Sequence, residues 1–185
     1  VLARKEREVK SRAAEHTVSL VGYTNAGKSH LMNTLTKAGV YVKNQLFSTL
    51  DTRTRQWHIR DWGRVLLSDT VGFIRDLPHH LVASFKATLA EARNAKLLLH
   101  VVDASSPQAE NHIRAVNEVL KELECDQKAT ILVLNKIDLV ADRSVLQVLE
   151  AKYPRAVAVS GLTGSGVDRL EDAVVHRIAE RLDHS

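Results

Sequence analysis

The chain has 185 residues, of which 44% are hydrophobic and 26% are charged, and its formal net charge is +4. These values are typical of a globular protein with one full-sized domain, and they argue against a disordered chain. No apolar run approaches the roughly 20 residues that a membrane span requires, so no membrane span is expected. The single cysteine, Cys125, cannot form an internal disulfide, which suits a cytoplasmic protein. The positive charge permits an acidic partner such as nucleic acid without requiring one.

The beginning of the chain, residues 1–15, differs from the rest. It has few apolar side chains and many charged ones, which are Arg4, Lys5, Glu6, Arg7, Glu8, Lys10, Arg12 and Glu15. Charge runs of this kind are usually solvated helix faces, and contact with an acidic surface such as RNA is the alternative. We expect residues 1–15 to be a helical linker from a preceding N-terminal domain, and residues 16–185 to form a single domain.

Short apolar runs alternate with segments of helical periodicity through the rest of the chain. Strands are predicted at 18–21, 56–60, 65–68, 97–102, 131–134 and 156–159, and helices at 29–37, 81–92, 108–123, 144–152 and 167–182. The fourth and fifth strands are continuously apolar, as expected for strands covered on both faces of a parallel sheet. The connection 61–64 is too short for a crossover, so the second and third strands should form a hairpin. We predict a three-layer α/β fold with a mostly parallel six-stranded sheet and one antiparallel edge strand.

A phosphate-binding loop is predicted directly after the first strand. Its residues match the pattern G-x-x-x-x-G-K-[ST] and read Gly22-Tyr23-Thr24-Asn25-Ala26-Gly27-Lys28-Ser29, with His30 next. Glycines let backbone N–H groups close around phosphate oxygens, and the helix N-terminus behind them adds roughly half a positive charge. Lys28 is predicted to reach the β- and γ-phosphates and Ser29 to bind Mg²⁺. The pattern therefore predicts nucleotide binding over residues 22–30.

A second element follows the third strand and reads Asp69-Thr70-Val71-Gly72. Asp69 would emerge at the carboxyl end of a strand, where doubly wound sheets place their ligands, and would hold Mg²⁺ through water. Gly72 lacks a Cβ, so its peptide can rotate to offer an N–H to the γ-phosphate. Spacing after the phosphate loop turns this otherwise weak signal into a strong one.

A third element selects the base. Asn135-Lys136-Ile137-Asp138 follows a buried strand, and Asp138 can accept hydrogen bonds from the N1–H and amino group of guanine. Adenine lacks this donor pair, and a site built around such bonds rejects it. Asn135 would brace the loops, and the Lys136 stem would cover the base. A later segment, Ser160-Gly161-Leu162, could offer the Gly161 N–H to guanine O6. Together the elements predict a P-loop GTPase; an ATPase or small-molecule kinase is the alternative that Asp138 disfavours.

The amino-acid sequence of these segments resembles that of the GTPase domain of the HflX proteins, in the Obg–HflX group of translation-associated GTPases. The resemblance covers nearly residues 1–180, and it is strongest at 20–29, 45–51, 67–78 and 97–105. It implies a monomeric switch that binds GTP or GDP with Mg²⁺, hydrolyses GTP to GDP and phosphate, and associates with the large ribosomal subunit in ribosome splitting or rescue. His30 and Gly161 depart from the family's usual threonine and alanine, so weaker nucleotide affinity with unchanged specificity is expected.

The catalytic residues expected from this comparison are Lys28, Thr49 and Gly72, with Ser29, Thr49 and Asp69 around Mg²⁺. Thr52 and Thr54 remain alternatives to Thr49 as the switch threonine.

Phe73 stands where Ras-like GTPases have the glutamine that orients water, so turnover should be slow until a partner or a second cation completes the site. In several GTPases that this loop resembles, an asparagine at the position of Asn25 helps to bind K⁺, which the resemblance therefore suggests as that cation. The alternative is a nucleotide-gated interaction module with negligible turnover. Trp57 and Trp62 are expected to pack in the core rather than to stack on bases.

Overall fold

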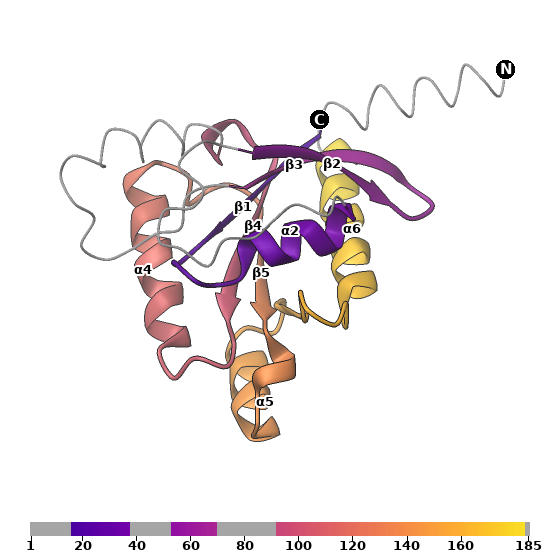
Figure 1. The fold of residues 1–185 in the computed structure, drawn as a ribbon. Coiled ribbons are helices and arrows are strands. Elements are labelled where there is room, and N and C mark those ends of the chain that lie inside the picture. Colours follow the sequence, from indigo (N-terminus) through magenta and orange to yellow (C-terminus); the bar gives the residue numbers. More distant parts are fainter. Residues whose placement is uncertain (1–15, 38–52, 70–91, 184–185) are drawn as a thin grey trace, which may run out of the picture.

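The structure of the chain is a computed structural model, which describes residues 16–37, 53–69 and 92–183 (Figure 1). These residues form a six-stranded sheet in the strand order β2-β3-β1-β4-β5-β6. The strands are β1 (Thr17–Gly22), β2 (Arg53–Ile59), β3 (Gly63–Asp69), β4 (Leu97–Asp103), β5 (Thr130–Asn135) and β6 (Val157–Ala158). The helices are α2 (Lys28–Thr36), α4 (Ala109–Glu122), the 3₁₀ turn η1 (Ile137–Leu139), α5 (Arg143–Lys152) and α6 (Val167–Asp183).

The sheet is parallel apart from its edge strand β2, which pairs antiparallel with β3. Asp61 and Gly63 take positive φ angles of 60° and 148° in the short connection, which is too short to cross over to a parallel neighbour. The predicted mixed sheet with one antiparallel edge strand is therefore confirmed.

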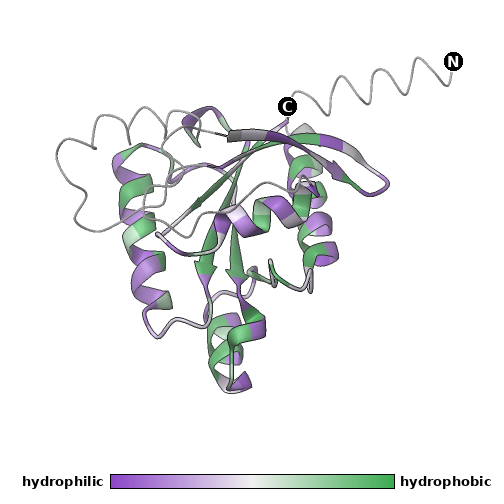
Figure 2. Cartoon of the chain, in the orientation of Figure 1, coloured by the Kyte–Doolittle hydropathy of each residue, from purple (hydrophilic) through white to green (hydrophobic). Residues whose placement is uncertain are grey.

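Helices cover both faces of the sheet. Leu99 of β4 packs in one apolar cluster with Leu31 of α2 and Val174 of α6. The preceding residue of the strand, Leu98, points to the opposite face and packs with Val116 of α4. Figure 2 shows the same arrangement, with hydrophobic residues along the central strands and hydrophilic ones on the outer sides of the helices. This double covering explains why the central strands are continuously apolar rather than alternating.

All six predicted strands are present, and their bounds shift by a few residues. β2 begins at Arg53 rather than at 56, and β6 has two residues instead of the predicted four at 156–159. The helices predicted at 29–37, 108–123, 144–152 and 167–182 correspond to α2, α4, α5 and α6. The linker at 1–15 and nearly all of the helix predicted at 81–92 lie outside the described residues. The turn η1 was not predicted, because three residues are too few to show a helical period.

Both tryptophans are packing residues, as predicted. Trp57 is fully buried in the cluster that α2 and α6 share. Trp62 packs against the same cluster, and its ring centroid lies 5.7 Å from that of His16. The hairpin of β2 and β3 is thereby anchored to the core.

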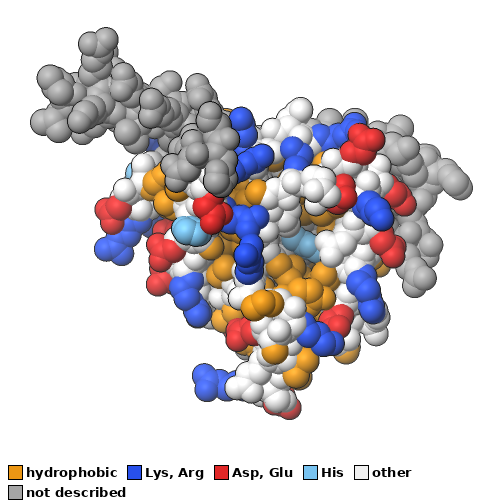
Figure 3. All heavy atoms as spheres, turned by 180° about the vertical axis from the view of Figure 1, so that it is seen from behind, with side chains coloured by type: hydrophobic (Ala, Val, Ile, Leu, Met, Phe, Trp, Pro, Cys, Tyr) orange, Lys and Arg blue, Asp and Glu red, His pale blue; other side chains and the backbone are white. Residues whose placement is uncertain are grey.

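Helix α5 is less deeply embedded than its neighbours. Leu149 is its one fully buried side chain among the described residues, whereas Val145 and Val148 are 46% and 51% exposed. A hollow of about 260 Å³ lies beside these valines, between α5 and the start of α4. Apolar side chains gather in the lower part of the face drawn in Figure 3. None of the described helices is long and apolar enough to cross a membrane.

The buried polar side chains of the sheet include a histidine. His100 of β4 is 3% exposed, and its backbone is flanked by Val21 of β1 and Leu132 of β5. Its Nε2 atom has no hydrogen-bond partner among the described residues. Burial lowers the pKa of His100 from 6.5 to about 4. The imidazole is therefore neutral in the folded protein at physiological pH.

The lowered pKa of His100 predicts acid sensitivity. This group does not lower stability above about pH 6.5, where the unfolded chain is also neutral, and it lowers stability progressively as the pH falls from 6.5 to 4, because the unfolded chain then binds a proton that the folded chain does not. We expect the free energy of unfolding to drop by about 2 to 3 kcal/mol between pH 7 and pH 4.5 from this residue alone. Urea unfolding of His100→Leu should show a correspondingly smaller drop, whereas His58→Leu, on the exposed side of β2, should follow the wild type. Parallel curves for wild type and His100→Leu would contradict the prediction.

Candidate nucleotide-binding site

The predicted site residues gather where the parallel strands end. The loop after β1 packs so closely that two of its glycines have no room for a side chain. A Cβ on Gly22 would lie 2.4 Å from the carbonyl oxygen of Val101, and one on Gly27 would lie 2.5 Å from Asn135 Nδ2. Gly27 also has a φ of 89°, and Asn25 has a φ of 65°. The spacing of glycines in this loop therefore follows from close approach and backbone shape together.

Lys28 and Ser29 begin helix α2 at the end of this loop. The Ser29 hydroxyl donates to Asp69 Oδ2 over 2.9 Å, which brings together the two ends of α2 and β3 that were predicted to meet. Lys28 is buried, and burial lowers the pKa of its ammonium group while the Asp69 carboxylate opposes that shift. The Ser29 hydroxyl, the Asp69 carboxylate and the Lys28 ammonium group therefore lie close together at one edge of the sheet.

Asn135 joins two loops through its side-chain amide. Its Nδ2 donates to the carbonyl of Ala26 over 3.0 Å, and its Oδ1 accepts from the N–H of Gly161 over 3.0 Å. Both hydrogen bonds are buried. The bracing that the sequence predicts for Asn135 is therefore present in the structure.

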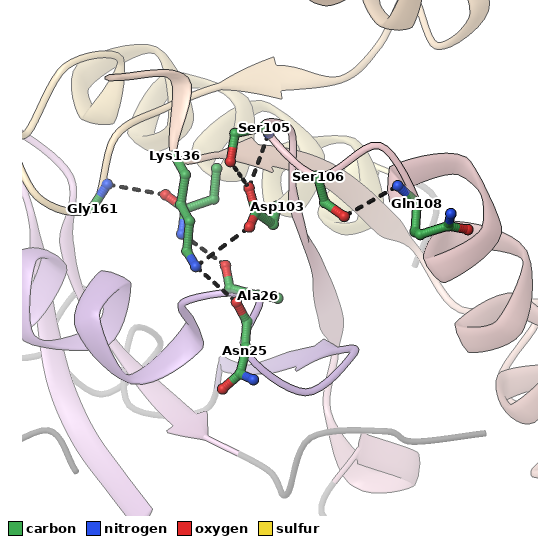
Figure 4. Close-up of polar contacts among 9 residues, drawn as sticks. Asn25, Ala26, Asp103, Ser105, Ser106, Gln108, Lys136 and Gly161 are labelled. Carbon is green, nitrogen blue, oxygen red and sulfur yellow. Dashed lines mark hydrogen bonds and ion pairs between the residues drawn. The ribbon is translucent and has the colours of Figure 1, made fainter. Parts of the chain in front are cut away.

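Lys136 lies across the phosphate-binding loop. Its φ of 61° turns the chain at the end of β5, and its Nζ donates to the carbonyl of Asn25 over 2.9 Å. The same Nζ forms an ion pair of 3.4 Å with Asp103 (Figure 4). Sequence reasoning missed Asp103, which accepts hydrogen bonds from the N–H and hydroxyl of Ser105. Its position at the end of a buried strand, like that of Asp69, is the signal that could have found it.

Ser160 orients the carboxylate predicted to bind guanine. Its hydroxyl donates to Asp138 Oδ1 over 2.7 Å and accepts from the N–H of Thr163 over 3.0 Å. Leu162, also among the predicted binding residues, is 77% exposed.

Gly161 makes two contacts that the sequence analysis did not predict. Its N–H, expected to serve guanine O6, donates to Asn135. Its carbonyl accepts from the hydroxyl of Thr34 in α2. A Cβ at this position would lie 3.3 Å from the backbone N and Cα of Leu31, so the glycine allows α2 to approach the loop closely. Close packing against α2 therefore favours glycine at position 161, where the backbone N–H also serves as a hydrogen-bond donor.

The remaining predicted residues fall into two groups. The carbonyl of Tyr23 accepts from Ala26 N over 3.1 Å, Thr24 is half-buried, and the side chain of His30 is exposed at the start of α2. Thr54, an alternative switch residue, lies within β2 with its Oγ1 3.2 Å from Ser68 Oγ. Thr49, Thr52, Gly72 and Phe73 lie outside the described residues.

Comparison with known families decides the identity of this fold. The family model described as 50S ribosome-binding GTPase matches residues 17–136. The chain belongs to this family. Among its relatives, the GTPase HflX of Escherichia coli K12 is 48% identical over 174 residues, and that of Magnetococcus marinus is 54% identical over 154 residues. These alignments cover 94% and 83% of the chain and identify it as a GTPase domain of the HflX type. The chain spans 41% and 35% of the lengths of the two relatives.

Solved structures give the same answer for the fold. A GTP-binding protein from Sulfolobus solfataricus in complex with GDP has a TM-score of 0.72 and 25% identity, covering 96% of this chain and 57% of that one. Era in complex with MgGDPNP and a segment of 16S ribosomal RNA has a TM-score of 0.67 and 24% identity, covering 88% of this chain and 56% of that one. The predicted P-loop GTPase fold is therefore confirmed for this family member.

Gly27 and Gly164 form a matched pair for testing the loop. Both have positive φ angles, 89° and 82°, but a Cβ on Gly164 would meet nothing within 4 Å. Gly164→Ala should therefore cost only the left-handed backbone penalty, about 1 to 2 kcal/mol. Gly27→Ala must also displace the Asn135 amide, and we expect a total of about 3 kcal/mol or more. Urea unfolding measures both costs, and equal costs would show that the Asn135 contact does not constrain Gly27.

Proposed function

We propose that this domain binds GTP and hydrolyses it to GDP and phosphate, acting as a switch. The observation that carries the proposal is the Asn135 amide, which joins the phosphate-binding loop to the loop that bears Ser160 and Gly161. This link would hold the proposed phosphate site and the proposed base site at a set separation. The names of the relatives and the GDP bound to the Sulfolobus protein support the same nucleotide.

The phosphate end of the proposed site uses charge and oxygen ligands. Lys28 would neutralise charge on the β- and γ-phosphates, and the N–H groups at the start of α2 would face their oxygens. Ser29 and Asp69 place a hydroxyl and a carboxylate 2.9 Å apart, which is a donor set that suits Mg²⁺. Mg²⁺ would supply further positive charge on the phosphates when bound. Thr49 is proposed to join these ligands, and Gly72 to contact the γ-phosphate.

The base end uses a carboxylate whose direction is fixed. Asp138 would accept hydrogen bonds from the N1–H and amino group of guanine. The Ser160 hydroxyl, which donates to Asp138 Oδ1, would orient the carboxylate for these bonds. Asn135 and the stem of Lys136 would border the base, and the exposed Leu162 would lie at its edge. The Gly161 N–H could serve guanine O6 only by leaving Asn135 or by sharing the bond.

Hydrolysis requires water to attack the γ-phosphorus while the bond to the β–γ bridging oxygen breaks. Phe73 cannot orient that water by hydrogen bonding, so the intrinsic rate should be slow. We propose that K⁺, held with the help of Asn25, supplies the missing charge near the phosphates. Phe73 also favours the second candidate, an interaction module that binds GTP with negligible turnover.

The proposed partner is the large ribosomal subunit. The family description names the 50S ribosome, and the net charge of +4 suits contact with RNA phosphates. The full-length protein would act on ribosomes in the cytoplasm as a monomer, in splitting or rescue. Residues 1–15 would link the GTPase domain to a further N-terminal domain.

The base assignment is tested by calorimetry with GTP, inosine triphosphate and ATP. Inosine triphosphate lacks the amino group, so the wild type should bind it more weakly than GTP and should bind ATP weakest. Asp138→Ala removes two charge-assisted hydrogen bonds, and GTP affinity should fall on the order of a hundredfold or more. The variant should then bind GTP and inosine triphosphate almost equally. Asp126→Ala, another surface carboxylate, is the control, and equal affinity of the wild type for GTP and ATP would refute the proposal.

The catalytic proposal is tested by single-turnover GTP hydrolysis with the full-length protein, in K⁺ or Na⁺ at constant ionic strength and with or without large ribosomal subunits. We expect slow hydrolysis in Na⁺ alone and faster hydrolysis when either K⁺ or the subunits are present. Indifference to the cation would remove the K⁺ proposal. A hydrolysis rate unchanged by the subunits, together with failure to co-sediment with them in the presence of a non-hydrolysable GTP analogue, would contradict the proposal that the ribosome is the partner.

A further inference from the structure

A side chain of α4 touches the phosphate-binding loop. The ring of Tyr23, the second residue of that loop, stacks on the imidazole of His112 with centroids 4.0 Å apart and planes inclined by 7°. In Figure 1 the loop that leads from β1 to α2 lies beside α4. Helix α4 carries none of the residues assigned above to phosphates, Mg²⁺ or guanine. The stack therefore connects the site to an element outside it.

Tyr23 also helps to shape the loop. Its carbonyl accepts from Ala26 N over 3.1 Å, which closes the turn that leads to Gly27. Its ring packs against the apolar cluster that contains Val21 and Val116, besides stacking on His112. A side chain held on two sides restricts the backbone that carries it, because few rotamers keep both contacts.

The two halves of the loop are held in different ways. The second half receives hydrogen bonds from side chains, since Lys136 donates to the carbonyl of Asn25 and Asn135 to that of Ala26. The first half begins at Gly22, which pairs with Val101 in the sheet, and the packing of the Tyr23 ring ties it to α4. Loss of the stack would loosen the first half while leaving the bonds of the second half in place.

The surroundings of His112 favour the neutral form of its imidazole, which stacks on the Tyr23 ring. Burial lowers the pKa of His112, and the nearby Asp103 carboxylate opposes that shift. Asp103 is itself paired with Lys136 over 3.4 Å. A neutral imidazole stacked on a phenol contributes roughly 0.5 to 1.5 kcal/mol beyond the area it buries.

We propose that His112 is a positioning residue for the guanine nucleotide, which holds Tyr23 and so keeps the first half of the phosphate-binding loop in the shape that receives phosphates. This inference rests on the proposed function, because it requires a nucleotide at the loop. It assigns α4 a part in nucleotide retention although none of the residues proposed to bind the nucleotide belongs to this helix. The quantity it controls is the rate at which nucleotide leaves.

The test measures release of GDP labelled with a methylanthraniloyl group, by stopped-flow fluorescence. His112→Ala should speed release by roughly three- to tenfold, because it removes one aromatic pair. His112→Phe keeps a flat ring and should restore release to within about twofold of the wild type. Val119→Ala removes a half-buried side chain of the same helix that packs against the same cluster, so it is the control for general loosening of α4. Urea unfolding of each variant establishes that it is folded and gives its stability.

The outcomes separate this inference from the function beneath it. Faster release in His112→Ala, rescue in His112→Phe and wild-type release in Val119→Ala support the positioning role. Wild-type release in His112→Ala, or equally fast release in Val119→Ala, overturns it while leaving GTP binding intact. A wild type that binds no labelled GDP overturns both.

Discussion

One buried amide holds the site together. Asn135 ends β5, and its side chain donates to Ala26 in one loop and accepts from Gly161 in another. Leaving either backbone group unpaired in the interior would cost about 1 to 3 kcal/mol, so the two loops are tied to one another through this residue. The amide also occupies the space that a side chain at position 27 would need, which makes Gly27 a consequence of Asn135 as well as of backbone shape.

The sheet order makes that contact possible. Because β1, β4, β5 and β6 are adjacent and parallel, their carboxyl ends meet at one edge, and segments far apart in the sequence become neighbours. Around the Asn135 amide, the loop after β1 is gripped from two further directions. Lys136, paired with Asp103, holds Asn25, and His112 of α4 stacks on Tyr23. The loop's unusual backbone angles persist because neighbouring elements hold it in place on several sides.

Features encoded by adjacent residues could be predicted from the sequence. The strands, most helices, the hairpin and the loop at 22–29 follow from periodicity, turn length and glycine spacing, which are local properties. The Tyr23–His112 stack and the Asp103–Lys136 pair could not, because they depend on strand order and on how α4 sits against the sheet. The same reason applies to the hydrogen bond from the Gly161 N–H to Asn135, which the sequence does not reveal. Which donor pairs with which acceptor is settled only by the packed chain.

The close approach at Gly161 has a mechanical consequence. Helix α2 carries Lys28 and Ser29 in its first turn. Further along the same helix, the Thr34 hydroxyl donates to the Gly161 carbonyl, and the backbone of Leu31 leaves no room for a side chain at Gly161. Helix α2 therefore links the loop after β1 to the loop that contains Gly161. Because one helix joins both loops, a displacement of α2 would shift their backbones together rather than one at a time.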